Sequence, residues 1–122
     1  TPQIVRNLYF SENRLFFTFV EDYIKDENLS EMDLNQFLKT YSPNNGILKS
    51  FSHYIEASGF EYSKENFITY QKEIRNALKQ TIATKIWGDE ARYKVQLLQD
   101  KPLLESLNYF QESAALLKKA YP

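Results

Sequence analysis

Apolar residues recur every three or four positions along most of this chain, the spacing of α-helices that bury one face. The longest such stretch covers 63–88. It opens at Ser63, whose hydroxyl can accept a hydrogen bond from a first-turn amide, and it ends at Gly88, which tolerates a left-handed conformation. We therefore expect one long helix over about 63–87, roughly 36 Å in length, with the other segments packed around it. Its apolar positions are Phe67, Tyr70, Ile74, Ala77, Leu78, Ile82 and Ile86.

Shorter apolar stripes on either side of this stretch predict further helices. Residues 42–46 combine Pro, Asn and Gly and are expected to form a turn. Ser30 or Asp33 is expected to cap one short helix, and Asp89 another. The predicted fold is therefore all-α, with residues 1–122 forming a single compact domain of about six helices. The flanking stripes are Ile4, Val5 and Leu8; Leu15, Phe16, Phe19, Val20, Tyr23 and Ile24; Leu34, Phe37, Leu38 and Tyr41; Ile47, Leu48, Phe51 and Ile55; Ala91, Val95 and Leu98; and Leu103, Leu107, Phe110, Ala114 and Leu117.

Composition supports this fold class and excludes several classes of function. The 3 glycines and 4 prolines among 122 residues are few for a turn-rich β-sandwich or barrel. The absence of cysteine removes disulfides, thiolate catalysis and cysteine-based zinc sites. A net charge of −1 gives no overall field that attracts nucleic acid, and no apolar run is long enough to span a membrane. The start at Thr1, without Met, suggests a fragment of a larger protein.

Residue types that carry catalysis are sparse. His53 is the only histidine, and it is expected on the helix side opposite Phe51 and Ile55, as a solvated surface residue. There is no nucleophile turn of the G-x-S-x-G type and no Gly-rich phosphate loop. A Ser–Lys dyad is left open by composition, because both residue types are common. We expect no catalytic, metal or cofactor site, and we expect the carboxylate pairs 26–27 and 89–90 to be solvated or to cap helices.

Three aromatic residues are candidates for an interface. Phe16 and Phe17 are adjacent, so both cannot face one core, and one of them is free to meet another domain. Trp87 ends the long helix, where it can anchor a neighbouring turn or a partner, although packing within the domain is the expectation we favour. The basic residues on the polar face of that helix are expected to be solvated, because Glu65 and Glu73 interrupt them. They are Lys72, Arg75 and Lys79.

Several motifs together resemble a known family. An early helix has the aromatic residues of LFFTFVEDYI, and FSHYIEASGFEYSKENF contains a Gly-aromatic-x-aromatic step at Gly59. The helix that begins IRNALK has Ile74 and Leu78 and ends at Gly88, and Asp100 precedes a leucine-rich close. This pattern, over residues 4–117, resembles the helical region that follows the catalytic domain in carboxy-terminal processing (tail-specific-type, S41) serine peptidases. Residues 33–48 depart from it.

The resemblance implies a parent protein that is a serine endopeptidase with a Ser–Lys pair and a PDZ-like substrate module. Those parts lie upstream of the matched region in the family, so no catalytic residue is carried over. The resemblance further implies a periplasmic or cell-envelope location in a bacterium. The expected role is a non-catalytic accessory domain that packs on the protease core or on a second copy, supports oligomerisation or shapes substrate access.

Two other functions stay open from the sequence. The first is a free-standing helical module that binds a protein or peptide between its helices. The second, an enzyme in its own right, is disfavoured by the single His and the lack of a catalytic turn. An accessory domain predicts an exposed apolar patch in the N-terminal half that includes Phe16 or Phe17, whereas a binding module predicts a groove between helices.

Overall fold

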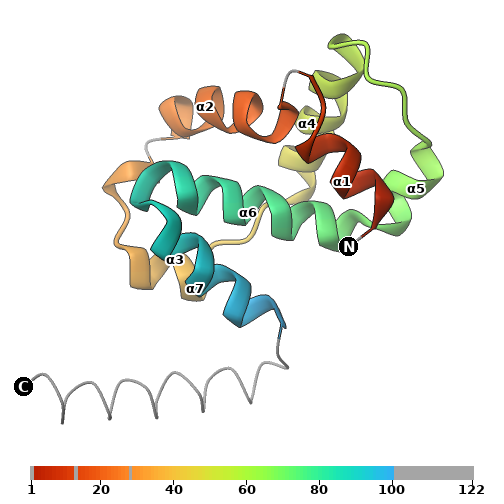
Figure 1. Ribbon diagram of the computed structural model, residues 1–122. Coiled ribbons are helices and arrows are strands. Elements are labelled where there is room, and N and C mark those ends of the chain that lie inside the picture. The colour runs from red at the N-terminus through yellow and green to blue at the C-terminus, as the bar shows by residue number, and fades with distance from the viewer. Residues whose placement is uncertain (1, 13, 28, 101–122) are drawn as a thin grey trace, which may run out of the picture.

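The computed structural model describes residues 2–12, 14–27 and 29–100. Within these ranges the chain forms seven α-helices and one 3₁₀ turn, with no strand, and the helices pack into one compact domain (Figure 1). The all-α prediction is therefore confirmed. The helices are α1 (Gln3–Tyr9), α2 (Leu15–Glu27), α3 (Leu34–Thr40), α4 (Asn45–Ala57), α5 (Lys64–Thr69), α6 (Gln71–Trp87) and α7 (Asp89–Asp100), and the 3₁₀ turn is Leu29–Glu31.

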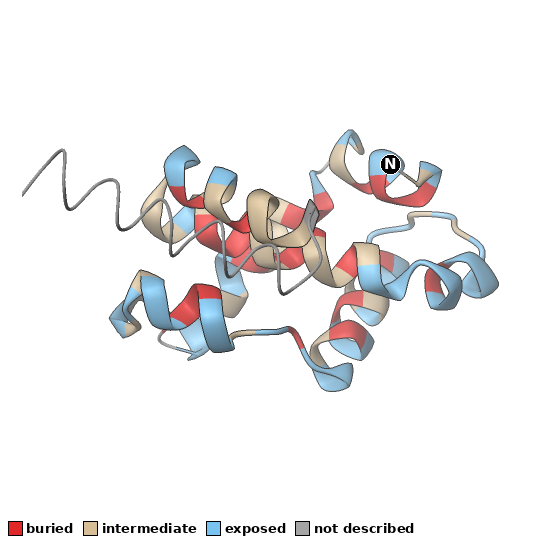
Figure 2. Ribbon diagram, turned by 90° about the horizontal axis from the view of Figure 1, so that it is seen from below, coloured by how far each residue is buried: buried red, intermediate tan, exposed pale blue. Residues whose placement is uncertain are grey.

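Helix α6 is the centre of the fold. It contacts α1, α2, α5 and α7, and it runs through the middle of the molecule between α2 and α7 (Figure 1). Buried residues lie on the sides of the helices that face one another, as Figure 2 shows. The buried face of α6 has the three-to-four spacing read from the sequence, because each turn of the helix returns a side chain to the core. Its members are Ile74, Ala77, Leu78, Thr81, Ile82 and Ala83.

The predicted helix over 63–87 is divided in the structure. Ser63 caps its start as expected, with Oγ accepting a hydrogen bond from the Asn66 amide at 3.2 Å. Tyr70 then leaves the helical region, with φ −105° and ψ 25°, and separates α5 from α6. The Phe67 ring on α5 packs on the Tyr62 ring, with the two ring centroids 5.6 Å apart, while α6 packs on α2. Apolar spacing alone does not reveal such a change of direction, because both pieces keep the helical period.

Most predicted helix ends are confirmed. The Asp33 carboxylate accepts hydrogen bonds from the Asn35 and Gln36 amides and so caps α3. Gly88 ends α6 with φ 94°, a conformation that costs glycine little. Asp89 differs from its prediction, because it is the first residue of α7 rather than the cap before that helix. Gly46 differs, because Asn44 caps the following helix and places Gly46 inside its first turn rather than in the predicted loop. The stripe over 103–117 lies outside the described residues.

Aromatic rings fill the core between α1, α2 and α4. The Phe16 ring stacks on the Phe51 ring with centroids 5.1 Å apart, and Tyr9 lies 4.7 Å from Phe16 on the other side. Phe19 meets Phe51 edge-on at 5.1 Å. Such stacked and edge-on pairs add a small directional stabilisation to the burial of apolar area. They fix the rotation of α2 about its own axis.

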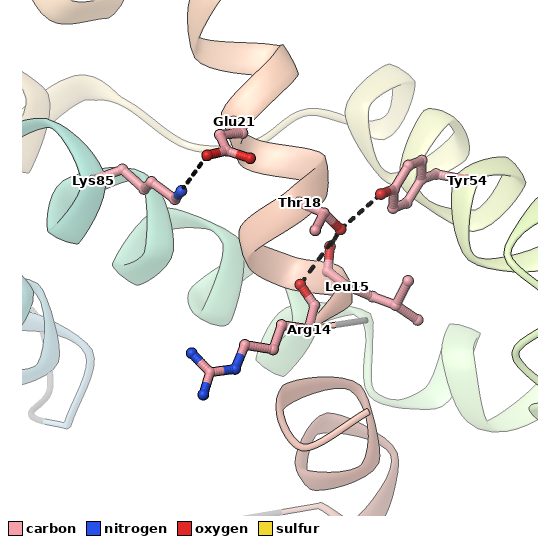
Figure 3. Close-up of polar contacts among 6 residues, drawn as sticks. All are labelled: Arg14, Leu15, Thr18, Glu21, Tyr54 and Lys85. Carbon is pink, nitrogen blue, oxygen red and sulfur yellow. Dashed lines mark hydrogen bonds and ion pairs between the residues drawn. The ribbon is translucent and has the colours of Figure 1, made fainter. Parts of the chain in front are cut away.

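Polar contacts hold α2 on both of its sides (Figure 3). On one side, the Tyr54 hydroxyl of α4 donates to Thr18 Oγ1 at 2.6 Å. On the other side, Lys85 Nζ of α6 lies 3.2 Å from Glu21 Oε1. The Glu21 side chain is more than half exposed, so this ion pair contributes little stability but restricts how α2 can lie on α6.

Candidate binding surfaces

The three predicted interface residues fall in different surroundings. Phe16 is 0% exposed and offers no surface to a partner in this fold. Phe17 is half-buried, and its ring has Lys85 Nζ 5.8 Å from the centroid. Trp87 is also half-buried and packs on the Phe37 ring at 5.0 Å, which joins the end of α6 to α3. The contacts recorded for the described residues join none of these three side chains to another, so they do not form one patch.

Residues considered for chemistry lie at the surface. His53 is exposed on α4, as predicted, and the carboxylate pairs at 26–27 and 89–90 are exposed as well. Across the described residues, no three His, Cys, Asp or Glu side chains are grouped so that they could hold a metal ion. None of the helices in the described ranges is both long and apolar enough to cross a membrane.

The most exposed large apolar side chain among the described residues is Phe10, at the end of α1. It is 86% exposed, whereas its neighbour Tyr9 is half-buried against Phe16. Phe10 borders a groove of about 620 Å³ between α1, α6 and α7. We call Phe10 and this groove the N-terminal surface. The patterns of the sequence did not single out Phe10, because it falls at a helix end where apolar periodicity carries no information about exposure.

The groove of the N-terminal surface is lined by polar as well as apolar groups. Gln80 Nε2 donates to Gln99 Oε1 at 2.6 Å and joins α6 to α7 across its floor. The Arg92 guanidinium lies 5.8 Å from the centroid of the Tyr9 ring. Burial raises the pKa of Tyr9 above its ordinary value, at which the hydroxyl is already neutral at physiological pH. The N-terminal surface thus pairs one exposed aromatic ring with a hydrogen-bonding groove that also contains the charged groups of Arg6, Glu73 and Arg92.

A second groove, the Lys79 groove, lies between α3, the chain just after it, α6 and α7. Its volume is about 540 Å³, and α3 and α7 lie side by side here (Figure 1). Its apolar lining comes from Leu38, Tyr41, Pro43, Val95 and Leu98. The charged residues among the described ones that line it are all basic: Lys39, Arg75 and Lys79.

Lys79 and Arg75 are held in place by the protein. Lys79 Nζ donates to the backbone oxygen of Leu38 at 3.1 Å and lies 5.6 Å from the centroid of the Phe37 ring. Burial lowers the pKa of Lys79. The Arg75 guanidinium donates to the side-chain oxygens of Asn45 and Gln71 through Nη2. Its Nε is buried and has no hydrogen-bond partner among the described residues.

The prediction of a solvated basic face is therefore right for Lys72 and wrong for Arg75 and Lys79. Lys72 is exposed near the start of α6, whereas the other two are half-buried. The cause is that α3 and the start of α4 cover this part of α6, since Lys79 donates to the Leu38 backbone oxygen and Arg75 donates to the Asn45 side chain. Sequence periodicity gives the polar face of a helix, but it does not tell which neighbour covers that face.

A third groove, of about 750 Å³, lies between α2 and α4 and has the opposite charge. Its acidic members are Asp22, Asp26 and Glu27, and His53 is on its rim. Two grooves of this nearly neutral chain therefore differ in charge. The groove beside α2 has acidic groups, and the groove between α3, α6 and α7 has basic groups.

Comparison with known proteins gives a family but no activity. Residues 6–88 match the model of a family described as a family of unknown function (DUF8443). This range includes α2 to α6 and most of α1. No curated protein and no solved structure matches the chain.

Proposed function

The chain belongs to the DUF8443 family of unknown function, and we propose that it is a non-catalytic protein-docking domain of an S41-type serine endopeptidase. The observation that supports docking is Phe10, which is 86% exposed beside the groove of the N-terminal surface. An aromatic ring that leaves water on binding supplies a large share of the energy at many protein interfaces. The proposed partner is the catalytic part of the same parent protein or a second copy of the chain.

The peptidase part of the proposal comes from the resemblance. Many of the residues that support it fall on α2 and α6, and they include buried positions such as Phe16, Ile74 and Leu78. Gly88, with its left-handed φ, is also among them. These positions build the scaffold rather than a site, so the role that they support is one of packing and placement. A periplasmic or cell-envelope location in a bacterium is part of the same proposal.

A free-standing peptide-binding module is the second candidate. It is favoured by the Lys79 groove, which lies between helices and combines an apolar lining with basic groups. Both candidates give the chain a binding role. They differ in the partner, which is the parent protein or a second copy of the chain in the first and a peptide of another protein in the second.

Peptidase activity on an unfolded protein substrate tests the proposal. The reading frame upstream of Thr1 is expected to encode a serine peptidase domain, and the full-length product is expected to cleave the substrate. The chain 1–122 alone is expected to show no cleavage above the buffer control. Cleavage by 1–122 that is abolished by changing one serine or one lysine would overturn the non-catalytic role, and a frame without a peptidase domain would overturn the S41 assignment.

A further inference from the structure

We propose that the Lys79 groove binds an acidic peptide segment with apolar side chains, presented by a partner protein. This site is separate from the N-terminal surface, and the inference does not use Phe10. It rests on the second candidate function above, for which it names the class of ligand, and it can fail while the docking role of Phe10 holds.

The charge of the groove is the first argument. Its described lining holds Lys39, Arg75 and Lys79 and no acidic side chain, although the whole chain has a net charge of −1. Like charges brought together at a partly buried site repel one another, and a carboxylate placed among them relieves that repulsion. The salt bridges recorded among the described residues involve Lys64, Lys85 and Lys94 and none of these three groups.

Unused hydrogen-bond donors are the second argument. An ammonium group has three N–H donors, and for Lys79 the recorded hydrogen bond goes to the Leu38 oxygen. Arg75 contributes its positive charge rather than a free donor, because its unpartnered Nε–H is buried away from the surface. A carboxylate is the natural acceptor for the Lys79 ammonium group, because hydrogen bonds between ionised partners are shorter and stronger than neutral ones.

The apolar lining is the third argument, and it favours a peptide over other anionic ligands. Val95 is fully buried at the base of the groove, and Leu98, Tyr41 and Leu38 line it as well. A volume of about 540 Å³ is far larger than an inorganic anion needs. Nucleic acid is disfavoured, because its backbone calls for an extended basic stripe and Glu73 interrupts the basic groups of α6. A peptide segment with leucine-type side chains and carboxylates can contact both the apolar and the basic residues of the lining.

The test uses the full chain and two labelled peptides of about 12 residues, with Leu at helical spacing. In the first the remaining positions are mostly Glu, and in the second each Glu is replaced by Gln. Fluorescence anisotropy gives the two affinities. The Glu peptide is expected to bind at least about ten-fold more tightly than the Gln peptide. Its affinity is expected to fall as the salt concentration rises from about 50 to 300 mM.

Three variants then locate the site. Lys79→Gln is expected to weaken binding of the Glu peptide about ten-fold. Lys39→Gln changes an exposed position, where no effect on folding is expected, and should weaken binding about two- to five-fold. Lys25→Gln removes an exposed lysine on α2 and is the matched control, with no change expected. Circular dichroism verifies that each variant is folded.

Several results would overturn the inference. One is equal affinity for the Glu and Gln peptides. Another is an equal loss of affinity in Lys25→Gln and Lys39→Gln. A third is that vesicles of anionic lipid, or single-stranded DNA, displace the Glu peptide as readily as unlabelled peptide does. A peptide bound with the expected charge and variant dependence, and not displaced in this way, supports it.

Discussion

At the scale of single residues, Phe16 and Phe17 show how neighbours in sequence take on different roles. Phe16 points into the core and stacks on Phe51 at 5.1 Å, whereas Phe17 is half-buried under the Lys85 ammonium group. A rotation of about 100° per residue along a helix accounts for the difference. The adjacency of the two residues predicts that one of them faces outward, and the apolar stripe of the sequence contains Phe16 but not Phe17, in agreement with the burial of Phe16.

This difference predicts unequal effects on stability. Phe16→Ala leaves a cavity in a fully buried aromatic cluster and is expected to lower the free energy of unfolding by about 3–5 kcal/mol. Phe17→Ala removes a half-buried ring and a contact with a cation, and is expected to cost about 1–2 kcal/mol. Urea unfolding followed by circular dichroism measures both. Equal losses in the two variants would contradict the observed orientation of α2.

At the scale of elements, the predictable features are those encoded locally. Caps at Ser63 and Asp33 and the glycine end at Gly88 follow from side-chain chemistry within a few residues, and the structure has them where expected. The division at Tyr70 and the cover that α3 places over Lys79 depend on contacts between distant segments. Local patterns hold no information about those contacts, so the long helix and the solvated basic face are two predictions that differ from the structure.

A pair of tyrosines links α2 to the chain after α3 and gives a dependence of stability on pH. The Tyr23 and Tyr41 hydroxyls are 2.8 Å apart. Burial raises the pKa of both side chains, and for Tyr41 the hydrogen bond to Tyr23 raises it further. In the unfolded chain each loses its proton near pH 10. The stabilisation that depends on the neutral forms is therefore present below about pH 10 and is lost as the pH rises above that value.

Tyr41→Phe tests this link. Unfolding free energies between about pH 8 and pH 11 are expected to fall less steeply above pH 10 in the variant than in the wild type, because one raised pKa is removed. At neutral pH the variant is expected to lose about 1 kcal/mol from the missing hydrogen bond. Tyr93→Phe, at a 59% exposed position, is the control and should keep the wild-type slope. Identical slopes in wild type and Tyr41→Phe would contradict the buried pairing.

At the scale of the whole molecule, the described chain is a scaffold around α6 with distinct surfaces on its sides. The N-terminal surface offers an aromatic ring, the Lys79 groove offers basic groups over an apolar lining, and the groove between α2 and α4 is acidic. All-α architecture was predictable from periodicity, because helices that bury one face leave a strong signal. The surfaces were not, because exposure and charge separation arise only when the helices are packed together.

The most direct test of the docking proposal is the affinity of the chain 1–122 for the catalytic part of its parent peptidase, produced separately and measured by calorimetry. The account predicts a saturable complex that Phe10→Ser weakens by at least about ten-fold, since an exposed aromatic anchor would be lost. Tyr93→Ser removes another exposed ring, outside the N-terminal surface, and should leave the affinity within about two-fold. Absence of a complex, or equal affinity of the wild type and Phe10→Ser, would contradict the account.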